Sequence, residues 1–383
     1  MCHSHRSIDD TNANLSRNVP IQFRFSRVHA PRRRDTVPLK QDEPVKPTRR
    51  DFLQIGASGL AATFADTSAP AHAAPSPANS RRFHFVQNDV FTLHRLQGNQ
   101  LAVFPDARGL SDVEMQEIAR ETNLSETTFV FPRDPAVELD RGIKVRIFLT
   151  DQEIPFAGHP TLGTAMVLRN RLANRKTTTG ENAKNDRVSL DLQVGKVPID
   201  FTERDGNIFG EMTQVDPTFG ATHDRSTVAA LIGVQPSDIS EEWPIQTVST
   251  GLPFAIVPLK RLATLQSLRP NFEKIRAYFE REKLLTDFYY VTRDTGDSNL
   301  GLRARGIYST GEDPATGSAS GCTAAWMVRY GVVPPDQVVH NLQGVEMKRP
   351  SHIFLRAGKQ GDKITNVRVG GHAVEIAEGE YSL

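Results

Sequence analysis

The stretch HPTLGTA at residues 159–165 has a counterpart 154 residues further on, DPATGSA at residues 313–319. Both stretches read [His/Asp]-Pro-x-x-Gly-[Ser/Thr]-Ala. A strand-like run precedes each of them, Lys144–Leu149 in the first case and Leu302–Tyr308 in the second, and a segment of helical character follows. A repeat of this kind predicts a chain built by duplication from two similar halves.

A second repeated pattern lies upstream of these motifs. The sequence predicts a helix over Met115–Glu121 followed by a strand over Thr128–Phe131, and a helix over Phe272–Lys283 followed by a strand over Phe288–Thr292. The order helix, strand, strand, Pro-initiated helix is therefore the same in both halves. We place the first half at residues 82–200 and the second at residues 201–383.

The residues after Asp313 are apolar around most of a helix, which is typical of a buried helix. Short β-type runs occupy much of the remaining sequence, among them Phe83–Val86, Leu101–Phe104, Val188–Leu192 and Phe254–Pro258. The predicted fold class is therefore α+β, with two pseudo-symmetric domains, each a curved β-sheet or barrel around a central α-helix.

The starts of the two central helices are candidate ligand sites. We expect the prolines at the first helical positions and Asp313 at an N-cap. The N-terminus of a buried helix offers free N–H groups and the positive end of the helix dipole, which favour a carboxylate. Two helix starts that face each other across a cleft would hold a small anionic molecule, and the small residues Gly158, Gly317 and Ser318 would let it approach the backbone.

Three ionisable residues lie near these helix starts, namely Glu126, His159 and Asp313. Glu126 follows a predicted helix and precedes an apolar strand, so we expect it to be partly desolvated. Desolvation raises the pKa of a carboxyl group and suits it to proton transfer. Each residue alone has a structural explanation, but the repeated placement of His159 and Asp313 favours a functional one.

Several other function classes find no support in the sequence. There is no dinucleotide or Walker motif, no HExxH and no Gly-x-Ser-x-Gly. Cys2 and Cys322 are the only cysteines, which excludes a disulfide framework and a thiolate zinc site. A net charge of +1 argues against a dedicated nucleic-acid binder, and no stretch approaches 18 apolar residues. We expect no metal, no cofactor, no nucleic acid and no membrane span.

Residues 1–80 are expected to be a disordered leader that carries an export signal. Arg49 and Arg50 precede a mildly apolar run at Ile55–Phe64, and Ala71-His72-Ala73 gives an A-x-A cleavage pattern. Together they resemble a twin-arginine signal, with cleavage near Ala73/Ala74. We expect a periplasmic or exported protein that meets the twin-arginine translocase, and a translation start later than Met1.

Five stretches of the chain resemble the PhzF-like family of phenazine-biosynthesis proteins, which have the diaminopimelate-epimerase fold. They are DVFT at 89–92, GNQLAV at 98–103, NLSET at 123–127, PFAGHPTLGTA at 155–165 and GEDPATGSA at 311–319. The resemblance covers about residues 82–383. Gln100 departs from it, since the family usually has proline there, and we expect little effect.

The resemblance implies cofactor-free and metal-free acid–base chemistry in a cleft between two halves, and a homodimer. The type enzyme of the family isomerises a dihydro-hydroxyanthranilate by moving a proton and a double bond. Glu126 matches the family's catalytic acid and base, and His159 and Asp313 match residues that position the substrate and tune the proton transfer. The matching substrate-binding residues are Ser125, Gly158, Thr316, Gly317 and Ser318. The export signal favours a different small carboxylate as substrate, because the phenazine pathway is cytoplasmic.

Two alternatives remain open at this point. One is a one- or two-base epimerase or racemase of an amino-acid-like substrate that uses Glu126. The other is a non-enzymatic exported protein that binds a small carboxylate. Racemisation by two thiols is disfavoured, because neither motif contains a cysteine and Cys322 lies well inside the predicted helix. The presence of all three ionisable residues favours an enzyme.

Overall fold

The computed structural model of the chain describes residues 80–174 and 186–383. The predicted leader, its twin-arginine signal and its cleavage site lie outside these residues. Within the described residues, no helix combines the length and the apolar character that crossing a membrane requires.

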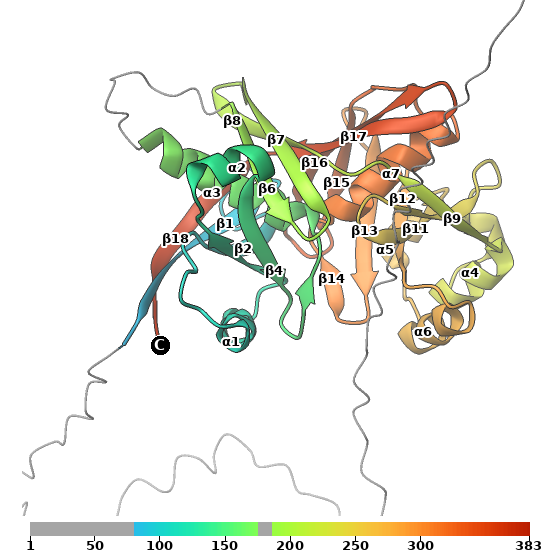
Figure 1. Cartoon of the computed structure of the whole chain (residues 1–383). Coiled ribbons are helices and arrows are strands. Elements are labelled where there is room, and N and C mark those ends of the chain that lie inside the picture. The colour runs from blue at the N-terminus through green and yellow to red at the C-terminus, as the bar shows by residue number, and fades with distance from the viewer. Residues whose placement is uncertain (1–79, 175–185) are drawn as a thin grey trace, which may run out of the picture. The chain divides into compact units, whose positions relative to one another are not determined.

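Helices lie between groups of strands along the described chain (Figure 1). The first part contains β1 Arg82–Val90, β2 Asn99–Phe104, α1 Asp112–Thr122, β3 Thr127–Phe131, α2 Pro135–Arg141, β4 Ile143–Phe148, β5 Glu153–Ile154, α3 Gly158–Asn174, β6 Arg187–Leu192, β7 Gly195–Arg204 and β8 Asn207–Thr213.

The second part begins with β9 and ends with the last strand, β18. It contains β9 Thr218–His223, α4 Arg225–Ile232, a 3₁₀ turn at Pro236–Asp238, β10 Ile245–Ser249, β11 Pro253–Leu259, α5 Leu262–Ser267, α6 Phe272–Arg281, β12 Asp287–Thr292, β13 Leu302–Tyr308, β14 Gly311–Asp313, α7 Gly317–Arg329, β15 Val339–Gln343, β16 Ser351–Gln360, β17 Lys363–Gly371 and β18 Ala373–Ser382. The strands and helices predicted from the repeats are all present.

The two parts have the same strand topology. In the first, β2 pairs parallel with β3, β3 antiparallel with β4, β4 parallel with β6, and β6 and β8 antiparallel with β7. In the second, β11, β12, β13, β15, β16 and β17 repeat this series of pairings in the same order. An antiparallel pairing of β8 with β17 joins the two halves into one sheet.

The chain does not divide between the halves at a single point. The last strand, β18, pairs antiparallel with β1, and β9 occupies the matching place beside β10. The predicted boundary between residues 200 and 201 falls within β7. By strand pairing, residues 82–213 and 373–382 form one half, and residues 218–371 form the other.

The halves are related by an offset different from that of the sequence motifs. Strands β4 and β13 begin at Ile143 and Leu302, and helices α3 and α7 begin at Gly158 and Gly317, so each pair lies 159 residues apart. The offset of 154 residues taken from the HP and DP motifs is therefore wrong by five residues as a structural register. Because the strands and central helices recur in the same order in both halves, the duplication itself is supported.

The corrected register changes which residues correspond. The sequence PFAG at 155–158 corresponds to PATG at 314–317, since each ends on the first residue of a central helix. His159 then corresponds to Ser318, and Ile154 to Asp313. The two halves therefore contribute different chemical groups to equivalent positions.

The prediction that Pro314 begins a helix with Asp313 at its N-cap is wrong. Helix α7 begins at Gly317 with Thr316 at the N-cap, and Asp313 is the last residue of β14. The backbone of Asp313 pairs with β13, which extends the strand and delays the helix. In α3 the proline is Pro160, the third helical residue, which the first turn tolerates because its N–H groups lack intrahelical partners.

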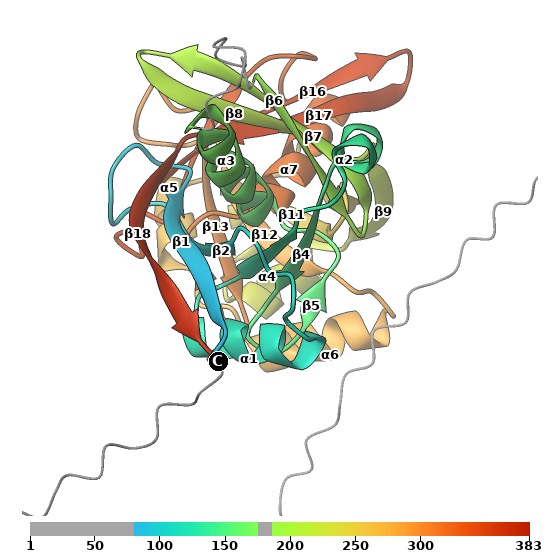
Figure 2. The same ribbon diagram turned by 60° about the vertical axis from the view of Figure 1, so that its left-hand side comes forward.

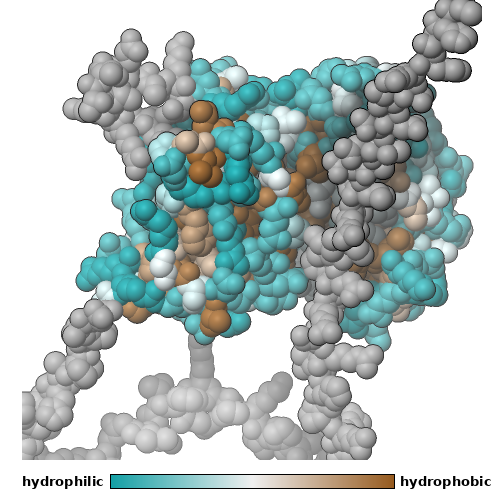
Figure 3. Space-filling model, viewed as in Figure 1, coloured by the Kyte–Doolittle hydropathy of each residue, from teal (hydrophilic) through white to brown (hydrophobic). Residues whose placement is uncertain are grey.

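The two central helices are buried, as predicted. Every residue of α7 from Gly317 to Val328 is buried, and residues 158–168 of α3 are buried too. Figure 2 shows α3 in green and α7 in orange with strands around both. The face in Figure 3 is mostly hydrophilic, and its hydrophobic side chains lie in separate groups. One cluster of buried apolar residues from both halves surrounds the two helices, and two separate clusters lie under α1 and under α4, α5 and α6.

Equivalent ion pairs fasten the hairpin that leads into each central helix. Arg146 contacts the Glu153 carboxylate through two nitrogens, at 2.8 and 2.5 Å, and Arg305 contacts Glu312 in the same way at 2.8 and 2.7 Å. Arg305 also donates to the backbone carbonyl of Leu265 at the end of α5. Bidentate pairs of this kind fix orientation as well as distance.

We expect Arg305→Ala to lower the free energy of unfolding by about 3 kcal/mol, because it leaves the Glu312 carboxylate without its partner in a largely buried place. The side chains of Arg305 and Glu312 are only 8% and 17% exposed. Urea denaturation measures the change. Arg82→Ala, which removes an exposed pair with Glu380, is the control and should change stability by less than about 1 kcal/mol. Equal losses in both variants would contradict the assignment.

Candidate active site

Glu126 lies directly before β3, and its carboxyl group lacks a hydrogen-bond partner on one oxygen within the described part of the chain. Its Oε2 atom is buried and has no hydrogen-bond partner among the described residues. Burial raises the pKa of Glu126 well above its ordinary value, and the nearby negative charge of Asp313 raises it further. A carboxyl group in this state carries a proton more readily than an exposed one and has a free oxygen with which to exchange it.

His159, the second residue of α3, places one ring nitrogen beside this carboxyl. Its Nε2 atom lies 3.4 Å from Glu126 Oε2 and 3.2 Å from the backbone carbonyl of Gln100. Burial lowers the pKa of His159 to about 3, so the ring is neutral at physiological pH. The carbonyl of Gln100 belongs to the backbone, so the departure from proline at this position leaves the contact in place.

Asp313 comes from the other half of the molecule and is hydrogen-bonded on both carboxyl oxygens. Asn99 Nδ2 donates to Oδ1 at 2.7 Å and Thr316 Oγ1 donates to Oδ2 at 2.6 Å. Burial raises the pKa of Asp313 to about 6, although these two hydrogen bonds and one from the backbone of Ala315 act in the opposite direction. The site therefore combines two buried carboxyl groups and one neutral imidazole.

The two helix starts touch each other at their first residues. A Cβ atom built on Gly158 would lie 2.5 Å from the Cα atom and the carbonyl carbon of Gly317 and 2.6 Å from the Ser318 nitrogen. Real Cβ atoms do not approach backbone so closely, so only glycine fits at position 158. The N–H groups of both first turns lack acceptors within their own helices, so the donors of both helices lie close together.

The other predicted binding residues differ in their surroundings. Thr316 and Ser318 are buried at 7% and 4% exposure, and Thr316 contacts Asp313 directly. Ser125 is exposed, and no hydrogen bond of its side chain links it to the rest of the group. The structure therefore brings together all the predicted site residues except Ser125, which adjoins the site only through Glu126.

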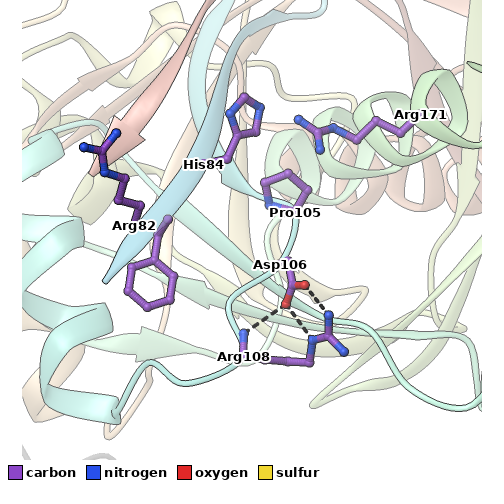
Figure 4. A pocket seen from close by; sticks show the side chains of 7 residues that line it. Arg82, His84, Pro105, Asp106, Arg108 and Arg171 are labelled. Carbon is purple, nitrogen blue, oxygen red and sulfur yellow. Dashed lines mark hydrogen bonds and ion pairs between the residues drawn. The ribbon is translucent and has the colours of Figure 1, made fainter. Parts of the chain in front are cut away.

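A separate hollow of about 560 Å³ lies away from these residues (Figure 4). Its lining residues are Arg82, Phe83, His84, Pro105, Asp106, Arg108 and Arg171. Arg108 pairs with Asp106 inside the hollow, and Arg82 pairs with Glu380 beside it. Since its cations are largely matched by acids, we assign no function to it. Among residues 80–174 and 186–383, no cluster of three or more histidine, cysteine or acidic residues could hold a metal ion.

Comparison with known proteins identifies the family of this chain. The family model described as phenazine biosynthesis-like protein, PhzC-PhzF, matches residues 88–379. The chain belongs to this family. The trans-2,3-dihydro-3-hydroxyanthranilate isomerase of Pseudomonas aeruginosa is 34% identical to it over 300 residues, which cover 78% of this chain and 99% of the relative. This PhzC-PhzF protein is accordingly an isomerase of unspecified substrate.

Solved structures confirm the predicted fold of this PhzC-PhzF protein. A PhzF family protein of Bacillus anthracis has a TM-score of 0.68 at 27% identity and covers 79% of this chain and 99% of its own. A hydroxyproline epimerase of Agrobacterium vitis has a TM-score of 0.52 at 12% identity, with 79% and 93% covered. The second likeness concerns the fold alone.

Sequence reasoning missed two polar residues that hold the PhzC-PhzF site together. Asn99 contacts both His159 and Asp313. Gln343, at the end of β15, donates to the backbone carbonyl of Asp313 at 2.8 Å and accepts from the backbone N–H of Thr316 at 3.0 Å. Both are buried amides at one end of a strand, and neither strand is purely apolar, so the sequence pattern alone did not distinguish them.

The raised pKa of Asp313 predicts a pH-dependent cost to stability. The unfolded chain loses this proton near pH 3.8 and the folded protein near pH 6, so the contribution of Asp313 to stability falls as pH rises through this window. At about 1.4 kcal/mol per pKa unit, the fall is about 3 kcal/mol. We expect Asp313→Asn to gain about that much relative to the wild type between pH 3.5 and pH 7, measured by urea denaturation.

The control for this measurement is Asp362→Asn, at an exposed position in the turn between β16 and β17. Its stability relative to the wild type should stay level over the same pH range. If the stability difference between Asp313→Asn and the wild type is also independent of pH over this range, the pKa of Asp313 is not raised in the folded protein.

Proposed function

We propose that this protein is a cofactor-independent isomerase that moves a proton, and with it a double bond, on a small carboxylate bound between its two halves. The observation that carries the proposal is the free, buried Oε2 atom of Glu126 beside the neutral ring of His159. Burial raises the pKa of Glu126 well above its ordinary value, and a carboxyl group of raised pKa is suited to both accepting and returning a proton.

In the proposed reaction Glu126 acts on a carbon of the substrate. Its carboxylate takes a proton from one carbon, the electrons of that C–H bond form a new double bond, and the neighbouring double bond shifts. A proton then returns to a second carbon, so the substrate and the enzyme recover their original proton count. The neutral ring of His159 lies beside the Glu126 carboxyl and is held by the backbone carbonyl of Gln100. Asp313, from the other half, raises the pKa of Glu126 by its negative charge.

The helix starts support binding of the substrate carboxylate. The N–H groups at the first turns of α3 and α7 and the hydroxyl of Ser318 are suited to an anion, and Gly158 and Gly317 leave the backbone accessible. The named relative acts on a dihydro-hydroxyanthranilate. For this protein we propose a small cyclic or amino-acid-like carboxylate.

A second candidate is an epimerase that inverts one carbon with two bases. It is favoured by the presence of two buried carboxyl groups from opposite halves, Glu126 and Asp313. Racemisation by two thiols finds no second thiol among the described residues, and Cys322 is fully buried inside α7. The family assignment favours either enzyme over the non-enzymatic binding protein.

Proton NMR in D₂O tests the proposal and separates the two candidates. The full chain is mixed with cyclohexadiene amino acids, common L-amino acids and hydroxyproline. Loss of a C–H signal with a displaced vinyl signal supports the isomerase, and loss at one carbon with inverted configuration supports the epimerase. Broadened ligand signals without any exchange would contradict both and favour a binding protein.

We also propose that the protein is exported and forms a homodimer. Export is supported by the order of Arg49-Arg50, the apolar run and Ala71-His72-Ala73, and the dimer by the family resemblance. Cell fractionation with N-terminal sequencing should find a periplasmic chain that begins near Ala74. Light scattering after gel filtration should give twice the mass of that chain.

A further inference from the structure

Asn99 is the one side chain of the described site that contacts both halves of its acid–base group. Its Nδ2 atom lies 2.7 Å from Asp313 Oδ1, 3.0 Å from the backbone carbonyl of Ala315 and 3.0 Å from His159 Nδ1. His159 belongs to one half and the other two residues belong to the second half. The amide is buried, with 1% of its surface exposed.

The partners of Asn99 fix the orientation of its amide. Asp313 Oδ1 and the Ala315 carbonyl accept hydrogen bonds, so the amide must present its NH₂ group to them. A flipped amide would place its own oxygen against both of these oxygens. The NH₂ group has two hydrogens for three neighbours, so one of them is shared. His159 Nδ1 therefore faces a donor and not an acceptor, which favours a lone pair on this ring nitrogen.

The contact of the second ring nitrogen, Nε2, also indicates which nitrogen of His159 carries the proton. Nε2 lies 3.2 Å from the backbone carbonyl of Gln100, which can only accept. A neutral imidazole has one N–H group, and both contacts therefore assign it to Nε2. Nε2 is also the ring nitrogen near Glu126, 3.4 Å from Oε2 but without a hydrogen bond to it.

The backbone of Asn99 is held firmly, so the amide has little freedom to turn away. Gly98 precedes it with a φ of +69°, and a Cβ there would lie 2.4 Å from the carbonyl oxygen of Val90. Arg349 donates from Nε to the Gly98 carbonyl at 2.8 Å and from Nη2 to the buried Asp89 carboxylate at 2.6 Å. The turn before β2 is thus held both by the close backbone packing at Gly98 and by the hydrogen bonds of Arg349.

We infer that Asn99 is a positioning residue that keeps the proton of His159 on Nε2, where it faces Glu126, and ties this ring to Asp313 across the two halves. His159 then presents a hydrogen atom, and not a lone pair, to the Glu126 carboxyl. The catalytic meaning of this inference rests on the proposed function, but the position of the proton does not.

Nitrogen NMR of the histidine rings measures the proton position directly. The full chain is labelled with ¹⁵N-histidine, and the His159 ring is identified as the one whose signals vanish in His159→Asn. In the wild type without ligand, we expect a neutral ring with a protonated Nε2 and an unprotonated Nδ1. If the wild-type spectrum shows a neutral ring with its proton on Nδ1, the inference is wrong, and no Asn99 variant is needed to show it.

Asn99→Asp replaces the NH₂ donor with an oxygen of nearly the same shape. We expect His159 to gain a proton on Nδ1 in this variant, either by a change of tautomer or by becoming charged. The matched control is Asn88→Asp, since Asn88 is a buried amide that donates to the Gly163 carbonyl of α3, whereas the hydrogen bonds of the His159 ring are with Asn99 and Gln100. An unchanged Nδ1 in folded Asn99→Asp would overturn the inference.

The kinetic effect separates this inference from the proposed function. With a substrate found by the D₂O experiment, Asn99→Ala should lower kcat by about 10²-fold and change KM little, because the ring loses its orientation and not its ligand contacts. If no substrate exchanges, the proposed function fails while the ring spectrum still tests the inference. If exchange is normal in Asn99→Ala, the positioning role fails while the proposed function stands.

Discussion

Glu126→Gln is expected to lower the rate of proton exchange by about 10²–10⁴-fold while ligand affinity stays nearly unchanged. The substitution removes the only group of the described site that combines a raised pKa with a free oxygen. It leaves the helix starts and Asp313, which are proposed to hold the substrate. Exchange is followed by proton NMR in D₂O, and affinity by the broadening of ligand signals.

The control for this experiment is Glu121→Gln, at an exposed position near the end of α1. It removes the same charge a few residues away and should leave the exchange rate unchanged. Equal exchange in the wild type and Glu126→Gln would show that another group carries the proton. Loss of binding in Glu126→Gln would indicate that this carboxyl holds the ligand.

Gly158→Ala is expected to have a large structural effect, because it adds a methyl group where the two helix starts touch. The new Cβ would meet the backbone of Gly317 and Ser318 at 2.5–2.6 Å, and backbone in two packed helices cannot move aside as a flexible side chain can. Overpacking of this kind costs about 3 kcal/mol in free energy of unfolding. It also separates the two helix starts, so we expect exchange activity to be lost.

Two further glycines provide a graded comparison. Gly317→Ala would bring its Cβ to 3.0 Å from Gly158 and 3.1 Å from Phe91, so its cost should be smaller. Gly220→Ala, on the exposed strand β9, makes only ordinary contacts of 3.5 Å and should be nearly neutral. Urea denaturation of the three variants measures this order, and a neutral Gly158→Ala would refute the direct contact of the helix starts.

The sequence was sufficient for the architecture because the hydrophobic patterns repeat. The strand run Leu302–Tyr308 and the start of the helix at Phe272 were placed to the residue. Burial of α7 followed from its apolar residues on all sides. These features depend on local sequence, which each half carries in its own copy.

The register between the halves could not be read from the motifs. Motifs HPTLGTA and DPATGSA look alike, but one begins inside a helix and the other at the end of a strand. A proline is compatible with a first helical turn and with the residue after a strand. The similar sequences of the two motifs therefore did not determine their secondary structure. Only the spacing of whole elements shows that Gly158 and Gly317 are equivalent.

The candidate site was partly predictable for a related reason. Glu126 stood out because it lies between a predicted helix and an apolar strand, and His159 and Asp313 because each begins one of the two similar motifs. Asn99 did not stand out, because an amide gains its meaning only from the atoms that surround it. Those atoms belong to residues that lie up to 216 positions away in the chain.

The closing strands of the two halves impose different conditions on how the chain folds. Arg82 of β1 pairs with Ser382 of β18, which is 300 positions away, whereas Ile245 of β10 pairs with His223 of β9 over 22 positions. The entropy of loop closure differs by about 2 kcal/mol between loops of these lengths. During synthesis on a ribosome, β1 of the first half therefore stays unpaired on one side until β18 has been made. The second half can pair β9 with β10 as soon as both strands have been made. The last residues of the chain complete the part of the molecule that emerged first.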